Sequence, residues 1–128
     1  MSDTFPQRLP DDRVSVLVVE DEMIIALDVQ MMLEDNGYRV LGPAGSVDGA
    51  LRLLDKLRPD VAVLDGNLRG RPIIPVARRL RSLEIPFVLS SAYDVFPFEG
   101  SEILEGAENV RKPVSEGRLL AALQRALS

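Results

Sequence analysis

A chain of 128 residues, 46% of them hydrophobic, is long enough to form one domain with a buried core. It contains no cysteine and no histidine, which excludes disulfides, thiolate or Ser-His nucleophiles and the commonest transition-metal sites. The net charge of −5 argues against a basic nucleic-acid surface, and no apolar run approaches the ~20 residues that cross a bilayer. We therefore expect a cytoplasmic protein that binds neither nucleic acid nor membrane.

The first 13 residues differ in pattern from the rest of the chain. They contain two prolines and the acidic pair Asp11-Asp12, which predicts a flexible N-terminal arm over residues 1–13. From residue 14 to residue 128, short apolar runs alternate with longer stretches of helical period. This alternation indicates βα units around a parallel sheet, in a single domain over residues 14–128.

The first βα unit follows this arm. Val16–Val19 is an unbroken apolar run, which is typical of a strand buried on both faces. Asp21 is the expected N-cap of a helix that ends near Asn36-Gly37, where glycine suits the left-handed C-terminal position. We expect the apolar side chains of this helix to belong to the core rather than to a partner surface: Ile24, Leu27, Met31 and Leu33.

The second and third units are bounded by clear stop and start signals. A second strand over residues 38–41 contains a charged residue and is expected to stop at Gly42-Pro43. Ser46 is the expected N-cap of the second helix, as Ser115 is of the last one. Val61–Leu64 predicts a third buried strand that runs directly into an aspartate.

The last two units are weaker in pattern. Phe87–Leu89 predicts a fourth strand that ends in Ser90-Ser91. Residues 94–106 have little helical pattern, so we expect the fourth crossover helix to be short or missing. A weak fifth strand over residues 107–111 ends at Lys112-Pro113, before the last helix.

The strand order follows from which strands are apolar throughout. The first, third and fourth strands should be central, and the second and fifth, which contain charge, should lie at the edges. This predicts a flavodoxin-like, doubly wound (βα)5 fold of the α/β class with a parallel sheet of order 2-1-3-4-5. In that fold ligands bind beyond the carboxyl ends of strands 1 and 3, where Glu20, Asp21 and Asp65 would converge.

Three converging carboxylates repel one another unless a cation joins them. Oxygen ligands at a partly open site favour Mg²⁺, with Mn²⁺ as a substitute, and the backbone carbonyl of Asn67 could add one ligand to Glu20, Asp21 and Asp65. An aspartate needs no general base to attack phosphorus, only positioning and charge neutralisation, which Lys112 and the metal would supply. Ser91 is placed to hydrogen-bond a phosphoryl oxygen.

These residues, in this order and at strand ends, give the chain a recognisable pattern. The chain resembles the receiver domain of two-component response regulators over about residues 14–128, with Glu20-Asp21 as the acidic pair, Asp65 as phosphoacceptor, Ser91 as the hydroxyl and Lys112-Pro113 as the Lys-Pro dipeptide. The resemblance implies Mg²⁺-dependent transfer from a sensor histidine kinase or histidine phosphotransfer protein to Asp65, then hydrolysis. It also implies a cis bond before Pro113.

By this resemblance the protein is a signalling domain that catalyses only its own phosphorylation and dephosphorylation, rather than an enzyme. Its downstream partner is a protein that the sequence does not identify. Since no output domain follows Ser128, we expect a stand-alone receiver. In receivers of this kind the kinase usually docks near the first helix, where Asp28 and Gln30 are candidate contacts.

A narrower resemblance is carried by Leu41–Ala44, Asp65–Leu68 and Pro86–Tyr93. These segments are similar to single-domain receivers of alphaproteobacterial stress signalling. That subgroup has Phe-Ala-Thr-Gly near the fourth strand, whereas this chain has Leu-Ser-Ser-Ala, so Ser91 replaces the usual threonine.

A second departure from the family concerns the aromatic residue that in many receivers swings inward on activation. Asn109 stands at that position here. The aromatic switch is then either absent or reassigned, and Tyr93 is the candidate for reassignment.

Two other functions are open to a chain with this pattern. A pseudo-receiver would keep the fold as an interaction module that phosphate does not regulate. A small Mg²⁺-dependent phosphohydrolase would usually need a second acid or base two residues beyond its aspartyl nucleophile, where this chain has Asn67. The intact set of site residues argues against the pseudo-receiver, and Asn67 argues against the phosphohydrolase, so the sequence favours the phosphoaccepting switch.

Overall fold

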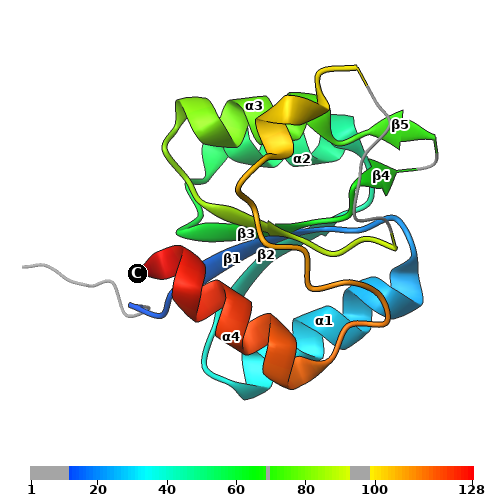
Figure 1. Cartoon of the computed structure of the whole chain (residues 1–128). Coiled ribbons are helices and arrows are strands. Elements are labelled where there is room, and N and C mark those ends of the chain that lie inside the picture. Colours follow the sequence, from blue (N-terminus) through cyan, green and yellow to red (C-terminus); the bar gives the residue numbers. More distant parts are fainter. Residues whose placement is uncertain (1–11, 69, 93–98) are drawn as a thin grey trace, which may run out of the picture.

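Four parallel strands form the centre of the molecule (Figure 1). The structure, a computed structural model, describes residues 12–68, 70–92 and 99–128. The sheet has the order β2-β1-β3-β6, with the bounds β1 Ser15–Val19, β2 Arg39–Ala44, β3 Val61–Leu64 and β6 Phe87–Leu89. The predicted α/β class and the order of the first four strands are confirmed.

Helices cover both faces of this sheet (Figure 1). Helices α1 (Met23–Asp35) and α4 (Glu116–Leu127) lie on one face, and α2 (Val47–Lys56) and α3 (Ile74–Ser82) lie on the other. Alternate residues of the buried strands point to opposite faces, so there are two apolar cores, one under each helix pair. Among the described residues, no helix combines the length and the apolar character needed to cross a membrane.

Helices α2 and α4 begin where capping side chains predict. Ser46 Oγ accepts the backbone N–H of Gly49 at 3.0 Å, and Ser115 Oγ accepts that of Arg118 at 3.3 Å. Both serines are therefore confirmed as N-caps, because each satisfies a donor that the first helical turn leaves free.

The edge strand β2 is longer than predicted. It continues through Gly42-Pro43 to Ala44, and its pairing with β1 shifts by one residue after Leu17. Gly42 has φ +92°, and a Cβ there would lie 2.7 Å from the backbone nitrogen of Ala44 and 3.1 Å from the carbonyl oxygen of Val18. The predicted stop was wrong because glycine lets the strand bend and still pair.

Helix α1 differs from the prediction in two ways. Its N-cap is Glu22 rather than Asp21, and no side chain caps it, because the carboxylate of Asp21 lies in the cluster described below. The buried residues are Ala26, Val29 and Leu33, and of the predicted core residues only Leu33 is among them. The others are exposed apolar side chains, together with Met23: Ile24, Leu27 and Met31.

The segment after Asp65 contains a short hairpin that the sequence did not predict. Strands β4 (Asn67–Leu68) and β5 (Arg71–Pro72) pair in antiparallel orientation before α3 begins. The Arg71 guanidinium lies 3.5 Å from the Asp48 carboxylate of α2, which ties the hairpin to the neighbouring helix. Two-residue strands have no periodicity to detect, which is why the pattern missed them.

In its described part, the last crossover has only a short helix, as predicted. This is the 3-10 helix η2 (Ser101–Leu104), while residues 93–98 lie outside the described part of the chain. The predicted fifth strand over 107–111 is present only as an isolated parallel bridge between Asn109 and Leu89, at the edge of the sheet beside β6. Its continuation is prevented by the backbone of Arg111, which has φ +58°.

The predicted N-terminal arm lies outside the described residues except for Asp12 and Arg13, which are exposed. The carbonyl of Val14 accepts the N–H of Arg39, and β1 starts one residue later. That residues 1–13 form an arm stays a prediction.

Candidate functional site

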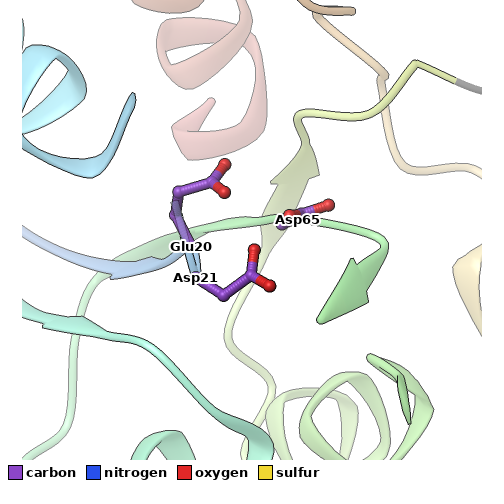
Figure 2. Close-up of side chains that lie close together, drawn as sticks. All are labelled: Glu20, Asp21 and Asp65. Atoms are coloured by element: carbon purple, nitrogen blue, oxygen red, sulfur yellow. The ribbon is translucent and has the colours of Figure 1, made fainter. Parts of the chain in front are cut away.

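Three carboxylates meet beyond the carboxyl ends of two neighbouring strands (Figure 2). Glu20 and Asp21 follow β1, and Asp65 follows β3. One oxygen of each lies within 4.8 Å of the others. Glu20 and Asp65 are buried, with exposed fractions of 5% and 6%, and Asp21 is half-buried. The structure thus brings together the carboxylates that the sequence placed at the strand ends.

The backbone of the sheet fixes where these carboxylates lie. β1 and β3 pair in register up to Val19 and Leu64, and the N–H of Asp65 donates to the carbonyl of Val19 at 2.9 Å. The N–H of Glu20 donates to the carbonyl of Ala44 at 2.9 Å. Glu20 is therefore held by the far end of β2, which reaches it only because that strand bends at its glycine.

Lys112 brings a positive charge into the carboxylate cluster. Its Nζ lies 3.1 Å from Glu20 Oε1, 3.3 Å from Asp65 Oδ2 and 3.9 Å from Glu22 Oε1. Burial opposes the charge of this amine, but its hydrogen bond to Glu20 and the charge of Asp65 outweigh burial and raise the pKa of Lys112. The lysine therefore stays charged beside both buried carboxylates. Glu22 is a contact that the sequence reading missed.

The environment of Glu20 favours its neutral form. Its pKa is raised to about 7, mainly by burial and to a smaller extent by the charge of Asp65, while hydrogen bonds from the Glu22 N–H and from Lys112 act in the opposite direction. Such a carboxylate, with two more beside it, would be stabilised by added positive charge. The oxygen-only donor set fits a hard divalent cation such as Mg²⁺.

The other two predicted site residues lie near this cluster. Ser91 is buried, and its carbonyl oxygen accepts the N–H of Lys112 at 3.3 Å. Asn67 begins the hairpin two residues after Asp65, and its backbone carbonyl stays a predicted ligand. Tyr93, the candidate for a reassigned aromatic switch, lies outside the described residues.

An apolar surface adjoins the acidic site. A pocket of about 380 Å³ is lined by two acidic residues of the site, by residues of α1, and by the end of β2 and the turn after it: Glu20, Asp21, Met23, Ala26, Leu27, Pro43 and Gly45. Met23 and Ile24, at the start of α1, are 75% and 78% exposed. We call Met23, Ile24, Leu27 and Met31 the α1 patch. The interpretation of these leucine and methionine residues as core was wrong.

The sequence matches the family profile described as the response regulator receiver domain over residues 16–124. The chain belongs to this family. Receiver domains are signalling domains rather than classical enzymes, they bind Mg²⁺ at an acidic pocket, and they interact with histidine kinases or phosphotransfer proteins and with downstream effectors. The Lys112-Pro113 bond of this receiver is cis, as the resemblance implied.

Individual relatives agree with the family assignment. The transcriptional regulatory protein PdtaR of Mycobacterium tuberculosis is 31% identical over 120 residues, which cover 88% of this chain and 56% of the relative. The receiver domain of a modulated diguanylate cyclase from Desulfovibrio desulfuricans G20 superposes with a TM-score of 0.80 at 28% identity, covering 91% and 94% of the two chains. SdrG from Sphingomonas melonis Fr1 does so with a TM-score of 0.76 at 30% identity, covering 91% and 98%.

The chain spans about half the length of the curated relatives that it matches. What those longer proteins do with the rest of their sequence is therefore a property of those proteins.

Proposed function

We propose that this receiver accepts a phosphoryl group on Asp65, from a sensor histidine kinase or a histidine phosphotransfer protein, in a Mg²⁺-dependent reaction. The phosphorylated form then changes its binding to a downstream protein partner, and the receiver works as a component of a phosphorelay. The narrower relation to stress-signalling receivers is part of this proposal.

One observation carries the proposal: Lys112 Nζ lies between Glu20 and Asp65, 3.1 Å and 3.3 Å from their carboxylate oxygens, at the carboxyl end of the sheet. A charged amine at this distance from an aspartate is also within reach of oxygens attached to that aspartate. It would offset the charge that a phosphoryl group adds.

The transfer itself needs little from the protein beyond position and charge. A carboxylate oxygen of Asp65 forms a bond to phosphorus while the bond from phosphorus to the donor's imidazole nitrogen breaks. The electron pair of the broken bond stays on that nitrogen, which takes up a proton. The product at Asp65 carries one more negative charge than the carboxylate, and Lys112 faces that charge.

Glu20, Asp21 and Asp65, with the Asn67 carbonyl, would hold the Mg²⁺, or Mn²⁺ in its place, and the bound ion would add positive charge beside the transferring group. Ser91, buried at the end of β6, would donate its hydroxyl to a phosphoryl oxygen. The rearrangement that satisfies this hydrogen bond is the proposed start of the switch.

The α1 patch supports docking of the phosphodonor beside Asp65. Its four apolar side chains are exposed on one helix that starts three residues after Glu20, and two of them line the pocket that also contains Glu20 and Asp21. An apolar helix surface of this kind suits packing against a helix of the donor protein. Asp28, exposed on the same helix, and Gln30 would lie near this contact.

The experiment that tests the proposal is incubation of the pure protein with Mg²⁺ and acetyl phosphate, followed by intact-mass measurement. One added phosphate is expected, and none in Asp65→Asn. The matched control is Asp35→Asn, an exposed carboxylate at the end of α1 that should leave uptake unchanged. An unmodified mass in wild-type protein that is shown to be folded would contradict the proposal.

The same variant separates this function from that of a pseudo-receiver. A partner that binds wild-type protein and Asp65→Asn equally well, with spectra that Mg²⁺ does not change, would favour an interaction module that phosphate does not regulate. A partner that prefers the phosphorylated form favours the switch.

A further inference from the structure

Asn109 lies between two segments of the site, which we call its two arms: residues 90–91 after β6, with Ser91, and residues 111–112, with Lys112. Its Oδ1 accepts two backbone N–H groups, that of Ser91 at 3.1 Å and that of Arg111 at 3.0 Å. Ser91 follows β6, and Arg111 directly precedes Lys112. One side-chain oxygen therefore joins the hydroxyl-bearing arm to the lysine-bearing arm.

This oxygen takes a place that a backbone carbonyl normally fills. Beside β6, the N–H of Leu89 donates to the carbonyl of Glu108, and the N–H of Val110 donates to the carbonyl of Leu89, both at 2.8 Å. In a regular parallel pair the N–H of Ser91 would next donate to the carbonyl of Val110. It donates to the Asn109 side chain instead, while the following bond, from the Lys112 N–H to the Ser91 carbonyl, is present but long at 3.3 Å.

The backbone of Arg111 explains the exchange. Its N–H points toward the same oxygen that Ser91 contacts, and the C=O and N–H of one peptide point in opposite directions, so the Val110 carbonyl points away from Ser91. Arg111 has φ +58°, an uncommon conformation for a residue with a side chain. Such a conformation persists where its surroundings hold it, and the hydrogen bond to Asn109 does so.

The turn at Arg111 sets the direction in which the chain enters Lys112. From there the lysine reaches Glu20 and Asp65 at 3.1 Å and 3.3 Å. On the other side of Asn109, the residue before it is anchored separately, because Arg125 Nε of α4 donates to Glu108 Oε1 at 2.8 Å.

We propose that Asn109 is a positioning residue of this receiver: its side chain replaces one strand hydrogen bond and so holds Ser91 and Lys112 in register around Asp65. Its effect on phosphorylation rests on the proposed function, whereas its effect on the two amides does not. Many receivers have an aromatic residue at this position that moves on activation. In this chain the Asn109 side chain instead accepts hydrogen bonds from both arms.

The test compares Asn109→Leu, which removes the acceptor oxygen, with Asn109→Asp, which keeps it. In ¹H–¹⁵N spectra of the unphosphorylated protein, the amide protons of Ser91 and Arg111 are expected to shift upfield in the leucine variant and to stay near their wild-type positions in the aspartate variant. Phosphorylation by acetyl phosphate should be about tenfold slower in Asn109→Leu, because Ser91 and Lys112 would no longer be held in place around Asp65. The rate should be mostly restored in Asn109→Asp.

Glu108→Gln is the matched control, since it weakens the exposed pair with Arg125 one residue away without touching either amide. It should leave both amide shifts and the rate unchanged. Asn109→Ala, which adds no bulk, replaces the leucine variant should the latter fail to fold.

Unchanged amide shifts in Asn109→Leu, or an equally slow rate in the leucine and aspartate variants, would overturn the inference. A wild-type protein that takes up no phosphate defeats the proposed function instead, and the amide shifts then still decide whether Asn109 joins the two arms.

Discussion

The two halves of the site are held by different amounts of backbone pairing. The acidic half follows β1 and β3, which pair over consecutive residues from Val16 with Val61 to Val19 with Leu64. Within the described residues, the backbone of the basic half, residues 109–112, pairs with β6 through an isolated bridge and with Ser91 through a long bond, and the Asn109 side chain accepts the Ser91 N–H. The carboxylates thus follow continuous strand pairing, whereas the backbone beside the amine is paired irregularly.

This difference predicts which substitutions affect folding and which affect chemistry. Changes that disturb the strands beneath the acidic half should lower global stability. Changes in the basic half should lower the phosphorylation rate while the protein stays folded.

The largest effect on stability is expected from Gly42→Ala, which disturbs the strand that supports Glu20. A Cβ there lies 2.7 Å from the Ala44 nitrogen at φ +92°, so the backbone must move, and unfolding free energy should fall by about 3 kcal/mol or more in urea titrations. Gly37→Ala is the control, because φ is +87° there but nothing lies within 4 Å of the added Cβ. The free energy of unfolding should then fall by only about 1 kcal/mol, from the strain of a left-handed backbone. Equal losses in the two variants would show that crowding at Gly42 has no effect.

Lys112→Met should separate rate from fold. It keeps most of the aliphatic stem but removes the charge 3.3 Å from Asp65, so we expect phosphorylation by acetyl phosphate to slow about 100-fold. Circular dichroism should show a folded protein. A rate within a few-fold of wild type would mean that the amine does not face the phosphoryl group.

The pH dependence of stability should come from the acidic half. Because the folded protein raises the pKa of Glu20 from 4.5 to about 7, the folded state binds this proton more tightly than the unfolded state does. With metal removed by a chelator, the contribution of Glu20 to the free energy of unfolding should be largest below pH 4.5. It should fall by about 3 kcal/mol at most as the pH rises toward 7.

Glu20→Gln should remove this slope and raise stability near pH 8 relative to wild type. Denaturant titrations at pH 5 and pH 8 measure both. A wild-type slope that the glutamine variant keeps would assign the effect to another group.

The smallest effect on stability is expected at the α1 patch, outside both halves. Ile24→Ser changes a side chain that is 78% exposed, so stability should change by less than about 0.5 kcal/mol. Phosphotransfer from a cognate kinase should slow about tenfold, whereas the rate with acetyl phosphate should not change, because that donor needs no docking surface. Equal rates with both donors would contradict docking at this patch.

The features that the sequence predicted correctly are those with local causes. Continuous apolar runs mark β1, β3 and β6 as buried, and Ser46 and Ser115 mark helix starts, because a side chain and a nearby backbone donor suffice for a cap. The convergence of Glu20, Asp21 and Asp65 followed as well, since parallel neighbouring strands bring their carboxyl ends to one edge.

The features that it missed depend on competition between distant parts of the chain. Helix α1 has apolar residues on two sides, so periodicity alone could not tell the buried set that includes Ala26 and Val29 from the exposed set that includes Ile24 and Met31. The extension of β2 depended on whether β1 could accept a bent partner.

The sequence by itself determined the class of fold, the order of the central strands and the identity of the acidic site residues. The apolar pattern of each strand and the charged residues at its end can be recognised within a short stretch of sequence. Only the tertiary structure decided which side of α1 meets the sheet, how far the fifth strand pairs and what Asn109 contacts. Those outcomes rest on hydrogen bonds and packing between segments far apart in the chain. A local sequence pattern does not determine which of several possible partners a segment contacts.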